Sequence, residues 1–359
     1  MISVIVMTFN GERYIKKCMD SVINQTIGIN NIQIIVIDDV SCDSTLDILE
    51  EYRVKYPNNI CIITRKVNST KAKEANRNIA MAYATGDYVL FLDQDDWYEI
   101  NAFEILMEYA SKYPELDYIE YNFRCIDEKN NTCEIKQVKE RGFNIYTFST
   151  EEERNYYAKI KILPGATYAW NKLYRKKYLI ENSIYHNDGS KKSGFGDNFF
   201  SGLLVLACHS IGKLDVCLYN YLNHSGSYSH DKSENSSVQF ERCKAGIFFY
   251  EECKTRGYLQ KNPEMVEYIF CRTFLLKTFW KFLMQCDPIP FNKLEFIQKE
   301  MLQRFPNYRD NKIMRDIKEI DYLFNILDQT WTTDYLIRLH HMIEKEMEQS
   351  DVKKYMYLT

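Results

Sequence analysis

The sequence lacks the features that mark several large classes of protein. Its 46 Lys and Arg residues stand against 50 Asp and Glu, a formal net charge of −4, so no basic excess is present to hold nucleic acid. Its 11 cysteines include no CxxC pair, which excludes zinc ribbons and thioredoxin-type redox sites. Scattered cysteines of this kind are typical of a reducing compartment.

Long apolar stretches are also missing. No segment approaches the ~20 apolar residues that a transmembrane helix needs. The chain starts with a strand-like run at residues 2–7, without a basic region or a cleavage site, so we expect no signal peptide. We therefore expect a cytoplasmic protein, at most peripheral at the inner face of a membrane.

What the chain does contain is typical of a globular protein of about two domains. It has 359 residues, of which 45% are hydrophobic and 27% charged. Its 28 Tyr and 20 Phe are unusually many; most should fill the core, and a few could stack on a base or a sugar ring. We expect a first domain over residues 1–230 and a helical region over 235–359.

Strand and helix patterns alternate through the first hundred residues. Short β-branched runs predict buried strands at 2–7, 32–37, 60–64 and 88–92. Helical spacing predicts helices at 11–23, 43–52 and 72–84, with Asp43 as a helix N-cap. Continuous apolar strands separated by helices indicate an α/β fold, with a mostly parallel sheet covered by helices on both faces.

The rest of the chain is first mixed and then helical. We expect strands at 118–123 and 167–174 and a helix at 196–208. After residue 225 nearly all of the pattern is helical, with breaks at 256–257 and 287–290.

Polar and acidic residues follow three of the predicted strands. They occupy residues 8–12, 38–43 and 93–97. Ligands of parallel sheets bind beyond the carboxyl ends of the strands, so these groups should meet on one rim. Like charges gathered there would repel one another, which stability alone does not require.

The acidic turn Asp93, Gln94, Asp95 is the strongest chemical signal. Carboxylates two residues apart at a strand end can share Mg²⁺ or Mn²⁺ and leave positions open for diphosphate oxygens. The alternative is an acidic turn that caps the next helix. The position directly after a buried strand favours the metal.

Two further groups point to a nucleotide. Asp38 or Asp39 could accept the N3–H of a uracil ring, whereas helix capping explains only Ser41 or Asp43. Arg77, inside the third predicted helix, could clamp a diphosphate or pair with Asp93.

Taken in order, these segments resemble bacterial family 2 glycosyltransferases of the GT-A fold. The resemblance rests on residues 3–10, 34–43, 77–97 and 169–175, and it spans roughly residues 1–230. It implies a mainly parallel Rossmann-like sheet that binds a nucleotide sugar. Met7, residues 71–72 and Gly196 depart from the family pattern.

The resemblance implies a role for each matched residue. The nucleotide sugar would be held by side chains from all three strand ends: Thr8, Asn10, Glu12, Asp38, Asp39 (on the base), Arg77, Asp93 and Gln94. Asp95 would bind the metal, Mn²⁺ or Mg²⁺, together with His224 or His230. Trp170 and Lys172 would lie on the acceptor side.

The family places its catalytic base at the start of a helix. Here Asp197 fits that position, and Asp188 remains the rival. The resemblance implies inverting transfer from a UDP-sugar to a hydroxyl of a glycan, a lipid-linked or a protein acceptor, in cell-surface polysaccharide synthesis. Two alternatives stay open: a nucleotidyltransferase, and a sugar-nucleotide-binding protein without transfer activity.

The apolar segment 268–284 carries three cations, Arg272, Lys277 and Lys281, close to one helical face. A basic amphipathic helix could lie on an anionic membrane, where lipid-linked acceptors sit. The alternative is a core helix that packs on the rest of the protein or on a second subunit of a homo-oligomer.

Overall fold

The computed structural model describes residues 1–69, 75–135, 138–159, 168–186, 196–225, 236–286, 288–315 and 324–349. The chain divides into two compact units. The first comprises Met1–Lys191 and Leu203–Asp231, and the second comprises Lys192–Gly202 and Lys232–Thr359.

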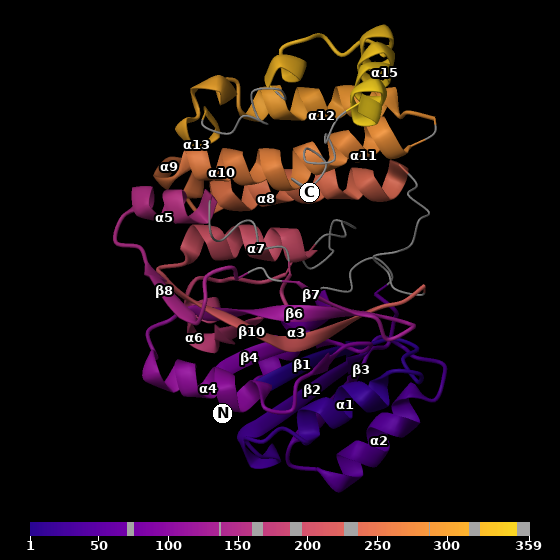
Figure 1. Ribbon diagram of the computed structural model, residues 1–359, viewed down its shortest axis with the longest axis vertical. Coiled ribbons are helices and arrows are strands. Elements are labelled where there is room, and N and C mark those ends of the chain that lie inside the picture. The colour runs from indigo at the N-terminus through magenta and orange to yellow at the C-terminus, as the bar shows by residue number, and fades with distance from the viewer. Residues whose placement is uncertain are drawn as a thin grey trace. The chain divides into compact units, whose positions relative to one another are not determined.

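Four parallel strands form the centre of the first unit. They are β1 (Ile2–Thr8), β2 (Ile32–Asp38), β3 (Ile60–Thr64) and β4 (Tyr88–Asp93), in the spatial order β3-β2-β1-β4. The four strands predicted from the sequence are confirmed. In Figure 1 they lie side by side at the indigo and purple end of the colour scale.

Helices connect these strands on both faces of the sheet. They are α1 (Ile15–Ile23), α2 (Thr45–Lys55) and α3 (Ala75–Tyr83), with a 3₁₀ turn η1 (Ile29–Asn31) before β2; α4 (Ala102–Lys112) comes after β4 along the chain. The steps from β1 to β2 to β3 run in one direction along the sheet, and the step to β4 reverses it. Right-handed crossovers therefore place α3 on the opposite face from α1 and α2.

The helices begin later than the sequence suggested. Residues 12–14 form a turn before α1, and α2 starts at Thr45 rather than at Asp43. Asp43 still serves the helix start, because its Oδ1 accepts a hydrogen bond from the Thr45 N–H at 3.0 Å.

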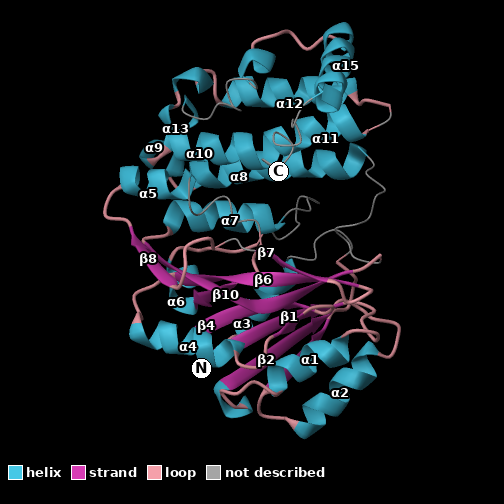
Figure 2. Cartoon of the chain, viewed as in Figure 1, coloured by secondary structure: helices cyan, strands magenta, loops and turns pink. Residues whose placement is uncertain are grey.

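Beyond β4 the sheet becomes mixed (Figure 2). Its further strands are β5 (Trp97–Tyr98), β6 (Tyr118–Asp127), β7 (Thr132–Ile135), β8 (Phe143–Thr147), β9 (Lys172–Arg175) and β10 (Ser210–Asn223). The expected strand 167–174 is only partly right: residues 168–171 are not strand, residue 167 lies outside the described residues, and β9 begins at Lys172. Strand β10 was not predicted from the sequence. It pairs with β5, β6 and β8.

The described residues of this part of the chain also form the helices α5 (Glu151–Tyr157), α6 (Lys176–Glu181) and α7 (Gly196–Ala207). The helix predicted at 196–208 is α7. Its first residues belong to the second unit and its last residues to the first.

The second unit is helical, as expected from the tail of the sequence. It contains α8 (Ser236–Thr255), α9 (Tyr258–Lys261), α10 (Pro263–Ile269), η4 (Phe270–Leu276), α11 (Lys277–Gln285), α12 (Phe291–Arg304), η5 (Tyr308–Asp310), α13 (Lys312–Arg315) and α15 (Thr333–Gln349). Gly257, with φ of 77°, separates α8 from α9 because this left-handed conformation suits glycine. The second expected break falls between α11 and α12.

The apolar segment 268–284 runs through α10, η4 and α11. Its large side chains, including Phe270, Phe274 and Phe282, are buried. Burial also lowers the pKa of Lys277 to about 8, with the nearby Arg242, Arg272 and Lys281 adding to the effect. The segment therefore packs as a core helix, and the apolar face that a membrane would need is covered. In the described part of the chain, no helix is both long and apolar enough to span a bilayer.

Candidate active site

The predicted rim forms where β1, β2 and β4 end. Thr8 is the register neighbour of Asp38, and Met7 that of Asp93, so the three carboxyl ends lie at one edge of the sheet. The residues that follow these strands are connected by side-chain hydrogen bonds. We take this edge as the candidate active site.

The loops after β1 and β2 are joined to each other. Asn10 donates its N–H to Ser41 Oγ at 2.9 Å and accepts the Cys42 N–H on its Oδ1 at 2.9 Å. Glu12 Oε2 accepts the Ser44 N–H at 3.0 Å. Asn10 has a φ of 48°, a conformation that Asn tolerates better than most residues.

Gln94 holds the β1 loop to the acidic turn. Its Oε1 accepts the Thr8 hydroxyl at 2.6 Å and the Phe9 N–H at 2.8 Å, and its Nε2 donates to the Phe9 carbonyl at 3.1 Å. Gly11 leaves room for this contact, because a Cβ at position 11 would lie 2.4 Å from Gln94 Oε1 and would displace the Gln94 side chain. Gln94 and Thr8 therefore shape the loop by binding each other.

The two carboxylates at the end of β2 are buried and hydrogen-bonded. Asp38 accepts the Ser41 N–H at 3.1 Å. Asp39 accepts the N–H of Ser69 at 2.9 Å and its hydroxyl at 2.5 Å. A base that binds Asp39 would have to share this carboxylate with Ser69 or displace it.

Asp93 and Asp95 have different partners. Arg77, which is nearly buried on α3, donates from Nη2 to Asp93 Oδ1 at 3.1 Å. Asp95 Oδ2 lies 2.9 Å from His224 Nε2. The His224 side chain is 7% exposed, and its Nδ1 lies 3.3 Å from the Tyr14 hydroxyl.

The Asp95–His224 pair fits a divalent cation. Two ligand atoms about 2.1 Å from an octahedral ion, at a right angle to each other, are about 3 Å apart, close to the observed distance. No third His, Cys, Asp or Glu of the described residues joins this pair in a three-ligand cluster. A cation bound here would take its other ligands from water or from a diphosphate, as Mg²⁺ does in many sites.

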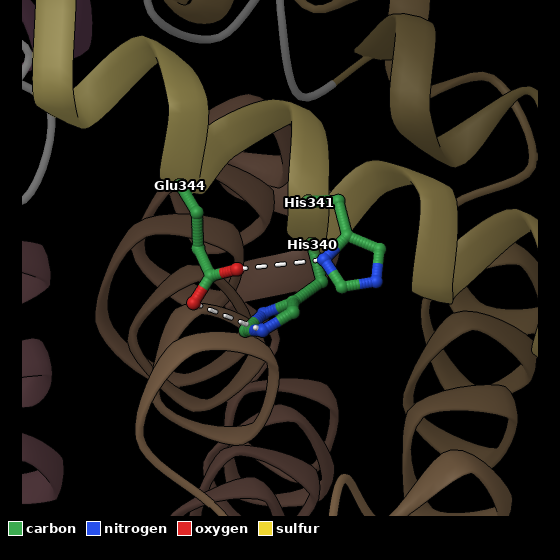
Figure 3. Close-up of side chains that lie close together, drawn as sticks. All are labelled: His340, His341 and Glu344. Atoms are coloured by element: carbon green, nitrogen blue, oxygen red, sulfur yellow. Dashed lines mark ion pairs between the residues drawn. The ribbon is translucent and has the colours of Figure 1, made fainter.

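A second candidate cluster lies on α15 (Figure 3). Glu344 is paired with His340 at 3.3 Å and with His341 at 3.5 Å, and these three ligand atoms lie within 4.8 Å of one another. His341 and Glu344 are well exposed. Ion pairs one helical turn apart are common on exposed helix faces, so this cluster carries no assignment of a metal.

Asp96 and Tyr219 are contact-rich residues to which the sequence analysis gave no role. Asp96 is 1% exposed, accepts the Tyr219 hydroxyl at 2.6 Å and accepts the Leu222 N–H at 2.8 Å. Burial raises the pKa of Asp96 well above its usual range, and the charges of Asp95 and Asp93 add to the shift. The motif at 92–97 includes Asp96, but the partners of Asp96 lie on β10, a strand that was not predicted.

The residues expected on the acceptor side are buried. Trp170 is 4% exposed, with Tyr219 stacked 4.4 Å and Tyr168 4.8 Å from its ring. Lys172 is 0% exposed, and its Nζ donates to the Tyr168 carbonyl at 2.8 Å and to Asn171 Oδ1 at 2.7 Å. Both side chains are therefore buried within the first unit.

Of the two candidate bases, Asp197 belongs to the described residues. Asp197 lies in the first turn of α7, as the sequence predicted, within the second unit. Asp188 lies outside the described residues, and so does His230, the rival of His224.

Comparison with known proteins identifies the family. Residues 3–181 match the family model described as glycosyl transferase family 2. The chain belongs to this family through that segment, which contains β1 to β9 and the acidic turn. The family is one of glycosyltransferases, which favours sugar transfer over the alternative of nucleotidyl transfer.

Individual relatives come from bacteria. The chain is 26% identical over 267 residues to the putative glycosyltransferase EpsH of Bacillus subtilis, covering 74% of this chain and 71% of EpsH. It is 38% identical over 143 residues to the poly(ribitol-phosphate) beta-glucosyltransferase of Bacillus spizizenii, covering 40% of this chain but 19% of that protein. The chain thus spans only a fifth of the length of this second relative.

A solved structure shares the whole fold. The crystal structure of Staphylococcus aureus TarS 1–349 in complex with UDP superposes with a TM-score of 0.68 at 19% identity, covering 97% of this chain and 92% of that one. TarS is named poly(ribitol-phosphate) beta-N-acetylglucosaminyltransferase; by sequence, 61% of this chain matches 35% of it, at 29% identity. The structural likeness confirms the expected GT-A architecture, with its helical C-terminal region.

Proposed function

We propose that this protein transfers a sugar from a UDP-sugar to a hydroxyl group of a cell-wall polymer, with Mn²⁺ or Mg²⁺ and with inversion at the anomeric carbon. Two relatives are named for transfer to poly(ribitol-phosphate), and TarS was solved with UDP. These names support a teichoic-acid-like acceptor and a glucosyl or N-acetylglucosaminyl donor. A glycan, lipid-linked or protein acceptor is the broader class.

The observation that carries the proposal is the meeting of Asp95 and His224 at the rim of the family 2 domain. These side chains come from positions 129 residues apart and meet at 2.9 Å. They would hold the cation, which would neutralise the charge that develops on the departing diphosphate. Arg77, paired with Asp93, would orient that carboxylate toward the donor.

The loops after β1 and β2 would bind the nucleotide. Asp39 would accept the uracil N3–H, with Asp38 fixing the turn behind it. Thr8, Asn10 and Glu12 would shape the loop around the uridine, and Gln94 would hold that loop against the acidic turn. These roles agree with the hydrogen bonds that already connect the same side chains.

Asp197 would act as the general base. From the first turn of α7, its carboxylate would accept the proton of the attacking hydroxyl. Direct attack with one base inverts the anomeric carbon. Residues 1–230 would thus bind the donor, and residues 235–359 would contribute to acceptor binding or to contacts with a second copy.

A donor screen tests the proposal. The purified protein is incubated with a panel of UDP-sugars and Mn²⁺, and the release of UDP is measured with and without poly(ribitol-phosphate). We expect metal-dependent release from one donor, faster with the acceptor, and lost in Asp95→Ala and Asp197→Asn. Asp197→Asn should still bind UDP. No turnover with any donor would instead favour a binding protein without transfer activity.

A further inference from the structure

Asp96 links two distant parts of the first unit. Its carboxylate is buried, and its two oxygens have different partners on β10: Oδ2 accepts the Tyr219 hydroxyl and Oδ1 accepts the Leu222 N–H. β10 ends at Asn223, and His224 follows immediately. One side chain thus fastens the turn that carries Asp95 to the strand end that carries His224.

The strand order shows why such a link matters. In the sheet, β4 and β10 are separated by β9 and β6, so no direct ladder joins them. The main-chain connection is the short β5, where Trp97 and Tyr98 pair with Asn220 and Tyr219. Asp96 extends this connection by one residue toward His224.

Tyr219 is held rigidly where it meets Asp96. Its ring stacks on Trp170 at 4.4 Å with an interplanar angle of 14°, and Tyr98 packs edge-on at 5.1 Å. Its hydroxyl also accepts the Asp93 N–H at 3.4 Å. A fixed phenol oxygen therefore contacts the first and the last residue of the turn that contains Asp95.

We propose that Asp96 and Tyr219 are positioning residues, which hold the Asp95 carboxylate and the His224 imidazole at the separation that one divalent cation requires. This inference rests on the proposed function, in which Asp95 and His224 bind the cation. A buried carboxylate costs free energy unless its oxygens accept hydrogen bonds, and both oxygens of Asp96 do so. Its two acceptor oxygens match the two donors that fix this strand end.

Tyr219→Phe is the main test, because it removes the hydroxyl that donates to Asp96 and accepts from the Asp93 N–H, and keeps the ring stack and every charge. Mn²⁺ affinity in the presence of UDP is measured by electron paramagnetic resonance of the free ion, and UDP affinity without metal by calorimetry. Loss of a group bonded directly to a metal ligand weakens metal binding roughly 10–100-fold. Tyr219 acts one contact further out, through Asp96, so we expect a loss toward the lower end of that range, roughly 10-fold. UDP affinity without metal should stay within about twofold of that of the native protein, because the substitution acts on the metal ligands.

Asp96→Asn is the second variant, since an amide cannot accept both the Tyr219 O–H and the Leu222 N–H. We expect the same selective loss of Mn²⁺ affinity, and activity that returns as Mn²⁺ is raised. Tyr121→Phe is the matched control: its buried hydroxyl donates to the Trp170 carbonyl at 2.7 Å and does not contact Asp96. It should leave Mn²⁺ affinity unchanged.

Two results would overturn the inference. One is Mn²⁺ affinity at the native level in both variants, with native circular dichroism. The other is an equal loss of Mn²⁺ affinity and metal-free UDP affinity, which would indicate general damage to the rim. Asp95→Ala distinguishes these two results from a failure of the proposed function. Unchanged Mn²⁺ binding in Asp95→Ala would place the cation elsewhere and would contradict both proposals.

Discussion

At the scale of single residues, the two carboxylates Asp93 and Asp95 of the acidic turn have different partners at the rim. Asp93 is neutralised by Arg77, whereas Asp95 faces an imidazole. A carboxylate already paired with a guanidinium attracts a cation less strongly than one that meets a neutral metal-binding nitrogen. The cation should therefore belong to Asp95 and His224, with Asp93 turned to the donor.

His224→Ala should weaken Mn²⁺ binding by more than the roughly 10–100-fold that the loss of an outer partner causes, because it removes a ligand itself. The measurement is titration of Mn²⁺ in the presence of UDP. His341→Ala is the matched control, since it removes a histidine from the other candidate cluster on α15. The opposite pattern, in which His341→Ala weakens Mn²⁺ binding and His224→Ala leaves it at the native level, would place the cation on α15.

At the scale of elements, the buried parallel strands were predictable and β10 was not. β1 to β4 are continuous apolar runs, which have one interpretation in a chain that alternates with helices. β10 contains the polar residues Lys213, Asp215 and Asn220, which interrupt its pattern. A signal was nevertheless present, because residues 216–219 form an apolar run that is typical of a buried strand.

The same contrast applies to the site. Parallel strands bring their carboxyl ends together, so the meeting of Asp38, Asp93 and Thr8 followed from the order of elements alone. The Asp96–Tyr219 contact joins residues 123 apart through a strand that was not predicted. Only a packed tertiary structure reveals such a pair.

The loop after β2 stores backbone strain. Val40 has a φ of 69°, which is unfavourable for a β-branched residue, and its side chain is 36% exposed. Val40→Asn should raise the free energy of unfolding by about 1 kcal/mol, since Asn tolerates this conformation. Urea denaturation measures the change.

Val54→Asn is the control for Val40→Asn. Val54 is an exposed valine within α2, with ordinary helical geometry, so the same substitution should give no gain. If Val40→Asn stabilises the protein while UDP affinity falls, the strain serves the nucleotide loop. An equal effect of both substitutions would contradict the assignment of strain to position 40.

At the scale of the whole molecule, the second unit contains two buried ionisable groups that change the stability of the protein in different pH ranges. Glu267 on α10 is 8% exposed; burial raises its pKa to about 7, opposed by a hydrogen bond from Asn311 and assisted by Glu264 and Asp310. Lys277 on α11 has its pKa lowered to about 8. Each group is more easily neutral in the folded protein than in the unfolded chain.

The signs follow from proton linkage. Between about pH 4.5 and 7 the folded protein binds the Glu267 proton more tightly than the unfolded chain, so this group lowers stability as the pH rises through that window. Between about pH 8 and 10.5 the folded protein holds the Lys277 proton less tightly, so this group restores stability as the pH rises. Both penalties are in force between pH 7 and 8.

Glu267→Gln and Lys277→Met should therefore each stabilise the protein near pH 7.5, by about 2 kcal/mol, given about 1.4 kcal/mol per pKa unit and a discount for solvent screening. The gain from Glu267→Gln should vanish at pH 4, and that from Lys277→Met should vanish above pH 10.5. Denaturant unfolding across this range measures both curves. Glu295→Gln, at an exposed site on α12, is the control and should show no pH-dependent gain in the free energy of unfolding. If Glu267→Gln stabilises the protein equally at pH 4 and pH 7.5, the shifted pKa of Glu267 is not the cause of that gain.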